Sequence, residues 1–200
     1  MVMKNGVAHS SRRTFRGKQS LNAGPAGVHD RCMIGDRWGV SDGEIVRSYP
    51  CDDFVTSPAL EAWRGVSVQA PSEAVWPWVT QVRLAPYSYD WIDNLGRRSP
   101  RELVDLPEPH VGDKFTTACG RRLGRIVSVD PGKHLTGTIL GAVMSYVLVA
   151  EDRDTTRLLF KLVMQTSRWV ALGLSVGDLI MARRQLLNLK LLAERHRAQL

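Results

Sequence analysis

The sequence predicts an α+β fold in which helices gather on one side of an antiparallel sheet. Two features of the chain predict it: an uninterrupted helical segment near the C-terminal end, and a run of strand-like segments between residues 114 and 167 joined by short turns. Strands joined by tight turns pair antiparallel. One strand and two helices precede that run, so the expected order is strand, two helices, antiparallel strands and one long helix.

The C-terminal segment 175–197 is expected to be a helix, because it holds no proline, a single glycine and many strong helix formers. At about 1.5 Å per residue it would run roughly 35 Å. One arc of the helix is apolar when residues are placed about 100° apart; it holds Met181, Ala182, Leu186, Leu189, Leu192 and Ala193. A narrower second row holds Ile180, Leu187 and Leu191. Two rows indicate a helix contacted from more than one direction, as a curved sheet would contact it; the alternative is one buried seam with the second row exposed.

The first half of the chain is predicted to hold fewer regular elements. Residues 64–70 alternate as a strand with one buried face, and a helix from 72 to about 84 is expected to be irregular at Pro77. Ser57–Pro58 and Ser99–Pro100 both have the pattern of a helix start, with serine as the cap and proline at the first helical position. We expect a short helix at each.

Five strands are predicted in the second half, at 114–118, 122–129, 134–140, 143–150 and 155–167. In the last of them Lys161 and Gln165 alternate with apolar residues, so they are expected on the face opposite Leu158, Phe160, Leu162 and Met164. The mixed residues 37–53 are expected to wrap the surface of the domain.

The positive charge of the chain is concentrated at its N-terminal end. Residues 1–32 carry six lysines and arginines against one aspartate, which accounts for +5 of the net charge of +7. This segment has almost no periodic apolar pattern, so we expect a disordered basic tail at 1–32 and a single domain at 33–200. A second interpretation is that the native protein starts at Met33 and lacks the tail.

Cysteine usage and hydropathy favour a cytoplasmic protein. Cys32, Cys51 and Cys119 are widely spaced and form no CxxC pair, so neither a disulfide framework nor a zinc site is predicted. No apolar stretch follows the N-terminal charges as a secretory signal would require. The longest uncharged run, His134–Ala150, has 17 residues and two glycines. Its valines, threonines and isoleucine favour two buried strands over a membrane span.

Two stretches of the chain resemble a known superfamily. The block APYSYDWIDNLGRRSPREL at 85–103 and the C-terminal GDLIMARRQLLNLKLLAERHR, together with the order of elements, resemble the polyketide cyclase/START-like superfamily with the Bet v 1 helix-grip fold, often labelled SRPBCC, and its actinobacterial members most closely. The resemblance covers roughly 37–197. It implies a curved antiparallel sheet that grips the last helix, and an elongated cavity between them for apolar or amphipathic molecules. Members carry lipids, sterols, plant hormones or quinones, or cyclise polyketides, and no single catalytic signature unites them.

The block at 85–103 also holds the densest group of polar and aromatic side chains. Binding groups are often displayed on such loops by a rigid scaffold. The tyrosines and tryptophan are candidates for a pocket entrance, and the carboxylates for orienting a ligand hydroxyl or polarising a carbonyl; the residues are Tyr87, Tyr89, Asp90, Trp91 and Asp93. The alternative is that the aspartates cap local turns or pair with nearby arginines while the aromatics fill the core.

Other candidates come from the strands. His134 follows a turn and is a candidate general base, although a lone histidine is more often structural. Bulky, adaptable apolar residues are what a lipid-sized cavity needs and also what a filled core holds; the candidates for a pocket lining are Met144, Tyr146, Phe160, Met164 and Trp169. No cofactor and no metal site are expected.

The function expected from the sequence is binding, transport or sensing of a hydrophobic small molecule, such as a lipid, polyketide or isoprenoid, in an internal cavity without catalysis. The alternative is a polyketide cyclase/aromatase or dehydratase that uses acid–base groups from among Tyr89, Asp90, Asp93 and His134. Nucleic acid binding is expected only through the basic tail, and the protein is expected to be a monomer or homodimer.

Overall fold

The computed structural model describes residues 35–93, 95–118, 120–166 and 168–198, with the backbone alone given at 92–93, 118 and 168–179. The predicted tail at 1–32 and Cys119 lie outside the described residues. Among the described helices, none combines the length and apolar character that crossing a bilayer requires.

Seven strands form one sheet in the order β1-β2-β7-β6-β5-β4-β3. The short β1 pairs with β2 in parallel, and every other neighbouring pair is antiparallel. The strands are β1 (Arg37–Trp38), β2 (Leu60–Val68), β3 (Lys114–Ala118), β4 (Arg121–Asp130), β5 (His134–Ile139), β6 (Ala142–Ala150) and β7 (Thr156–Met164). The predicted α+β class with an antiparallel sheet is therefore confirmed.

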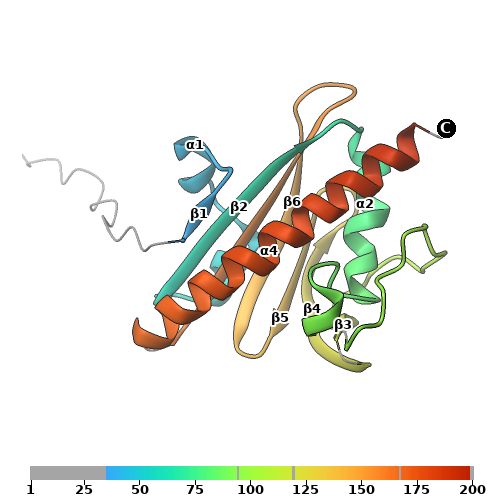
Figure 1. Cartoon of the computed structure of the whole chain (residues 1–200). Coiled ribbons are helices and arrows are strands. Elements are labelled where there is room, and N and C mark those ends of the chain that lie inside the picture. Colours follow the sequence, from blue (N-terminus) through green and yellow to red (C-terminus); the bar gives the residue numbers. More distant parts are fainter. Residues whose placement is uncertain (1–34, 94, 119, 167, 199–200) are drawn as a thin grey trace, which may run out of the picture. The chain divides into compact units, whose positions relative to one another are not determined.

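The long C-terminal helix α4 (Arg168–Arg197) crosses one face of the curved sheet, beside α2 (Ser72–Thr80) and the 3₁₀ turn η2 (Gln81–Arg83) that continues it (Figure 1). The predicted seam is buried, with Leu186, Leu189 and Ala193 fully covered. The second apolar row is mostly exposed: Ile180 is 52% and Leu191 46% exposed, while Leu187 is half-buried against the core. The alternative of one buried seam is therefore the closer description of α4.

Hydrogen bonds hold α4 against β2. Lys190 donates to the carbonyl of Ser67 at 2.7 Å, and Glu194 accepts the backbone N–H of Gln69 at 2.8 Å. Near the C-terminal end, Arg197 donates to the carbonyl of Gln69 and to the carboxylate of Asp154. These hydrogen bonds fix α4 to the C-terminal end of β2. Together with the apolar packing of α4 on the sheet, they give the helix-grip arrangement.

The two short helices predicted to start at Ser57–Pro58 and Ser99–Pro100 are not present in the structure. Residues 57–59 lead directly into β2, because the N–H of Ala59 already bonds the carbonyl of Met164 at 3.0 Å and so extends the sheet. Ser99 directs both its N–H and its hydroxyl to the carboxylate of Asp90, so its side chain does not cap a helix. The short helix in this region is instead α3 (Asp90–Asp93).

The opposite face of the sheet is also covered. The segment containing α1 (Asp42–Ile45) and the 3₁₀ turn η1 (Pro50–Phe54) packs there over a second apolar cluster that includes Tyr49, Cys51 and Trp63. Lys161 points to this face, as predicted, but it is buried, with Nζ 2.5 Å from Asp52 Oδ1 and 3.1 Å from Glu61 Oε1. The surface-wrapping segment thus gives the sheet two buried faces.

Candidate functional site

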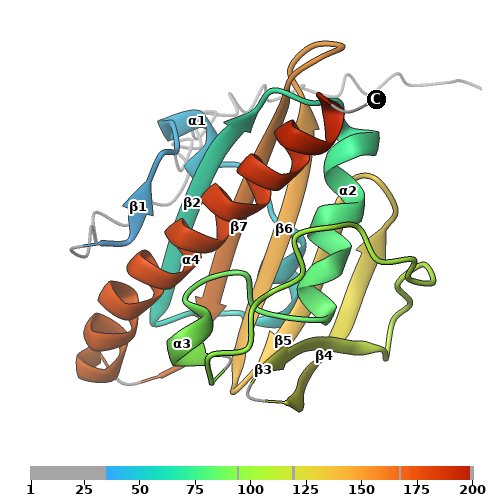
Figure 2. The ribbon, with the colours of Figure 1, turned by 45° about the vertical axis from the view of Figure 1, so that its right-hand side comes forward.

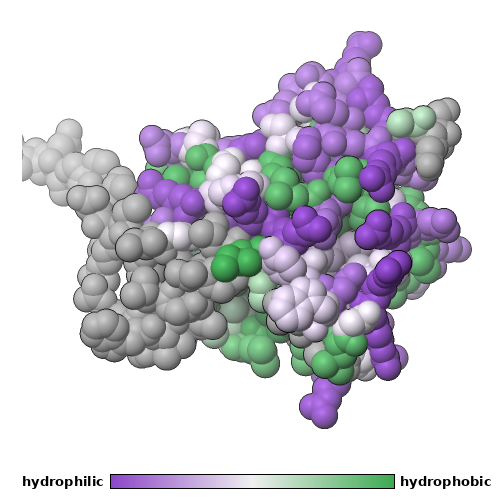
Figure 3. All heavy atoms as spheres, in the orientation of Figure 1, coloured by the Kyte–Doolittle hydropathy of each residue, from purple (hydrophilic) through white to green (hydrophobic). Residues whose placement is uncertain are grey.

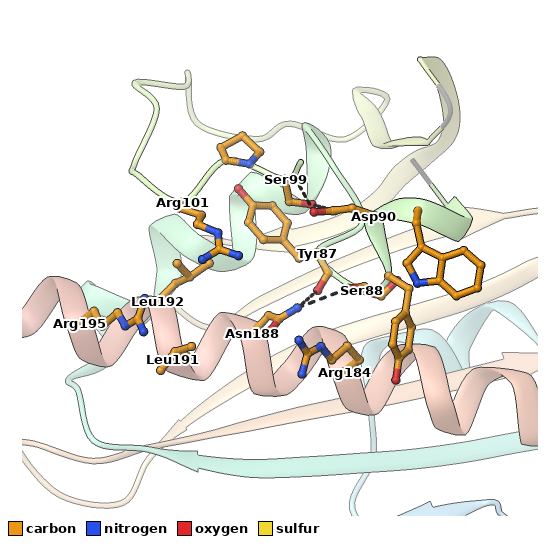
Figure 4. A pocket seen from close by; sticks show the side chains of 13 residues that line it. Tyr87, Ser88, Asp90, Ser99, Arg101, Arg184, Asn188, Leu191, Leu192 and Arg195 are labelled. Atoms are coloured by element: carbon orange, nitrogen blue, oxygen red, sulfur yellow. Dashed lines mark hydrogen bonds between the residues drawn. The ribbon is translucent and has the colours of Figure 1, made fainter. Parts of the chain in front are cut away.

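A pocket of about 550 Å³ lies between the segment 87–101 and the C-terminal half of α4 (Figure 4). Figures 1 and 2 both show α3 beside α4 at this place. The lining comes from the loop (Tyr87, Ser88, Tyr89, Asp90, Trp91, Ser99, Pro100, Arg101) and from the helix (Arg184, Asn188, Leu191, Leu192, Arg195). On this face of the protein, hydrophobic residues are interspersed among hydrophilic ones (Figure 3).

The loop wall is anchored at Tyr87, which is buried and has a positive φ of 56°. Gln81 donates to the Tyr87 hydroxyl at 2.7 Å, and its side-chain carbonyl accepts the N–H of Val104. Burial raises the pKa of Tyr87 to about 12, so this hydroxyl stays protonated. On the other side of the tyrosine, Asn188 donates to its main-chain carbonyl at 2.8 Å. The loop is therefore fixed both to η2 and to α4.

A second connection joins the loop, the helix and the sheet. The side chain of Gln185 accepts a hydrogen bond from the Tyr146 hydroxyl and donates one to the carbonyl of Pro86, both at 2.5 Å. Because Tyr146 lies on β6, this glutamine fixes the spacing between the sheet, α4 and the start of the loop.

The carboxylate of Asp90 is engaged by its own loop. It accepts the N–H of Ser99 at 2.9 Å and the hydroxyl of the same serine at 2.5 Å. These bonds, drawn as dashed lines in Figure 4, connect the first residue of α3 to Ser99. The geometry favours a positioning role for Asp90 in the wall of the pocket.

The pocket carries an excess of positive charge. Arg101, Arg184 and Arg195 line it, and the acidic lining residue is Asp90. The guanidinium of Arg184 lies 5.9 Å from the ring centroid of Tyr89, within the range of a cation–π contact. On the helix wall, Leu191 and Leu192 lie between Arg184 and Arg195 along α4.

Four of the residues proposed from the block at 85–103 line this pocket: Tyr87, Tyr89, Asp90 and Trp91. The side chains of Asp93 and Trp169 are not among the side chains that the structure describes. His134 is not among the lining residues; its Nε2 lies 3.0 Å from the hydroxyl of Ser128, and burial lowers the pKa of its imidazole.

The candidates proposed on the strands lie in the core between the sheet and the helices. Tyr146 and Phe160 are buried, with ring centroids 5.1 Å apart, and Phe115 packs on Tyr146 from the other side. Met144 and Met164 are half-buried against the same cluster. These side chains fill space beneath α4 and are not among those that line the described pocket.

Sequence reasoning did not select the helix wall or Arg101. The signal was present, because residues 184, 188, 191 and 195 are separated by four, three and four positions and so share one helix face. Since that stripe mixes arginine, asparagine and leucine, it has no apolar periodicity to indicate a binding wall.

The described residues contain no group of three or more histidine, cysteine, aspartate or glutamate side chains placed to hold a metal ion. In that part of the chain, Cys51 is a free, buried thiol, and burial raises its pKa to about 11. Such a thiol is protonated and a poor nucleophile.

No family model matches the chain, and no curated protein matches it by sequence. Solved structures do match it. Protein MLL2253 from Mesorhizobium loti is 18% identical with a TM-score of 0.47, over 68% of this chain and 97% of that one. Protein NE0264 from Nitrosomonas europaea is 15% identical with a TM-score of 0.46, over 71% and 99%. The Zhui aromatase/cyclase from Streptomyces sp. R1128 is 17% identical with a TM-score of 0.41, over 68% and 94%.

The sheet order, the two covered faces and the grip on α4 define the chain as an α+β protein of the helix-grip type. The pocket beside α4 is its candidate functional site.

Proposed function

We propose that this protein binds and carries a small molecule with a hydrophobic body in the pocket between segment 87–101 and α4, and that it does so without catalysis. One observation carries the proposal: large apolar side chains are left exposed at the pocket, with Trp91 73% and Leu191 46% exposed. The volume of about 550 Å³ falls in the range of small-molecule sites, which combine apolar walls with a few polar groups. On this proposal the ligand binds beside α4 rather than among the core residues beneath it.

The hydrogen bonds of the wall support binding rather than turnover. Asp90 is held by Ser99, and the Tyr87 hydroxyl is held by Gln81. A general acid or base must reach the proton that it transfers. Of the acid–base groups considered for a cyclase or dehydratase, Tyr89 and Asp90 line the pocket and His134 does not. A cytoplasmic location and a monomer or homodimer remain part of the proposal.

The site is tested with 1-pyrenebutyramide, a neutral fluorescent probe, by anisotropy titration. Leu191→Ser removes exposed apolar surface from the pocket wall, and we expect it to weaken binding about fivefold to tenfold, since burying such a side chain contributes about 1–1.5 kcal/mol when it is half covered beforehand. Ile180→Ser is the matched control, because Ile180 is similarly exposed on the same helix but does not line the pocket. Equal affinities in the two variants would place the probe elsewhere and refute the proposed site.

A further inference from the structure

The side chains at the two ends of the pocket are cationic. Eleven residues separate Arg184 from Arg195, which corresponds to about 16 Å along the helix axis at about 1.5 Å per residue. Arg101 extends from the loop toward α4 on the side of Leu192, so that loop and helix both bring an arginine to that end (Figure 4). The helix wall of the pocket thus has an arginine at each end, with Asn188 and Leu191 between them.

Few of the described carboxylates lie close enough to neutralise the positive charge of these arginines. Within the described ranges, no carboxylate lies within ion-pair distance of Arg101, Arg184 or Arg195. Two arginines elsewhere in the fold do have carboxylate partners: Arg157 bonds Glu44 at 2.6 Å, and Arg197 bonds Asp154 at 2.5 Å. The acidic lining residue, Asp90, directs its oxygens to Ser99. The lining therefore carries three guanidinium groups against one carboxylate, a formal charge of +2.

The chemistry of these groups selects a type of ligand. A guanidinium presents a planar fork of donors that fits carboxylate and phosphate oxygens, and it also stacks on aromatic rings. Arg184 already makes a cation–π contact with Tyr89, whereas Arg101 and Arg195 are exposed residues on opposite walls. Leu191, which is 46% exposed, lies between the two ends and offers a surface for an apolar body.

We infer that the ligand of this pocket is an amphipathic organic anion, with a carboxylate or phosphate group held by Arg101 and Arg195 and an apolar body that extends along Leu191 toward Tyr89 and Arg184. The inference rests on the proposed function, whose site it shares. It adds the charge of the ligand and the residues that bind the charged group.

The test compares 1-pyrenebutyrate with its neutral amide on the full chain by fluorescence anisotropy. We expect the acid to bind about tenfold or more tightly than the amide, since hydrogen bonds to a charged group are the stronger kind. Arg101→Gln and Arg195→Gln are each expected to lower the affinity for the acid about tenfold and to leave the affinity for the amide within about twofold. The preference for the acid should also shrink as salt is raised.

Arg183→Gln is the matched control for total charge. Arg183 is the neighbour of Arg184 on α4, but its guanidinium lies over the ring of Trp38, 5.1 Å from the centroid, and it does not line the pocket. The same loss of one positive charge there should leave the affinity for the acid unchanged. A loss equal to that of Arg101→Gln would mean that net charge alone attracts the acid, and would overturn the inference.

Competitors with one ten-carbon chain distinguish the two anionic groups. Decanoate or decyl phosphate should displace 1-pyrenebutyrate at lower concentration than decanol, and the stronger of the two identifies the group that the arginines prefer. If decanol competes as well as both anions while the amide probe still depends on Leu191, the pocket binds ligands but does not select anions. If neither pyrene probe depends on Leu191, the proposed site itself is wrong.

Discussion

The phenolic oxygen of Tyr146 lies 2.5 Å from Oε1 of Gln185, so a residue of β6 is hydrogen-bonded to the middle of α4. The same glutamine donates to the carbonyl of Pro86, immediately before the loop wall of the pocket. One side chain on α4 therefore positions the helix against the sheet and the loop against the helix.

Replacing Gln185 with leucine removes both bonds and leaves the buried hydroxyl of Tyr146 and the carbonyl of Pro86 without this partner. We expect a loss of about 1–3 kcal/mol in the free energy of unfolding, because two hydrogen bonds at about 0.5–1.5 kcal/mol each are removed. Urea unfolding measures it. Gln165→Leu, at an exposed position after β7, is the control and should change stability by less than about 0.5 kcal/mol. Equal effects in the two variants would show that the network contributes nothing.

Asp90 and Ser99 should behave as one structural unit. Because the carboxylate accepts both the N–H and the hydroxyl of the serine, Asp90→Asn and Ser99→Ala should each loosen the segment between them. We expect faster cleavage by trypsin at Arg97 and Arg98, and a similar drop, of about threefold to tenfold, in affinity for 1-pyrenebutyramide. An effect confined to the Asp90 variant would instead indicate that the carboxylate contacts the ligand directly.

Stability should depend on pH through the pair Glu44–Arg157, which connects α1 to β7. The bond from Arg157 holds the pKa of Glu44 below its usual value of 4.5. A carboxyl with a lowered folded-state pKa stabilises the fold above its unfolded-state pKa, and that contribution is lost as pH falls through the folded-state value. Glu44→Gln should therefore cost about 1.5–3 kcal/mol at pH 7.

The difference between wild type and Glu44→Gln should shrink as pH falls below about 4.5 and vanish once Glu44 is protonated in both states. Urea unfolding at pH 7, 5, 4 and 3 follows it. Asp53→Asn, an exposed position on η1, serves as the control. A difference that is constant over this range would mean that the ion pair does not stabilise the fold.

The sheet should be sensitive to a single methyl group at Gly137 on β5. A Cβ there would lie 2.0 Å from the ring of Phe115, which packs directly over the glycine. Gly137→Ala should cost at least about 2 kcal/mol, because a filled core does not accept the extra volume. Gly43→Ala, where a Cβ would meet nothing within 4 Å, should be neutral or slightly stabilising. Thermal unfolding compares the two, and similar melting temperatures would contradict this packing.

The sequence predicted the strands and the long helix because each carries a regular apolar pattern. It failed at Ser99 for a physical reason: the serine that looked like a helix cap is bound by Asp90, nine positions earlier, and no local pattern shows that. The burial of Lys161 was missed in the same way, since its partners Asp52 and Glu61 come from segments far away in the chain.

Of the two walls of the candidate site, the sequence indicated the loop wall and not the helix wall. The sequence drew attention to the block at 85–103 because it holds a dense group of tyrosine, tryptophan and aspartate, and four of these residues line one wall of the pocket. The facing wall was not selected, because it forms only when Asn188 and Gln185 dock the loop onto α4. Contacts about 100 residues apart are set by the fold and cannot be read from spacing.

Binding of the ligand between the loop and α4 is tested most directly by backbone amide NMR spectra of the labelled protein titrated with 1-pyrenebutyrate. If the ligand binds there, the largest shifts occur at Ser88, Tyr89, Asn188 and Leu191. Shifts concentrated instead at Met144 and Phe160 would place the ligand beneath the helix and contradict the proposed site.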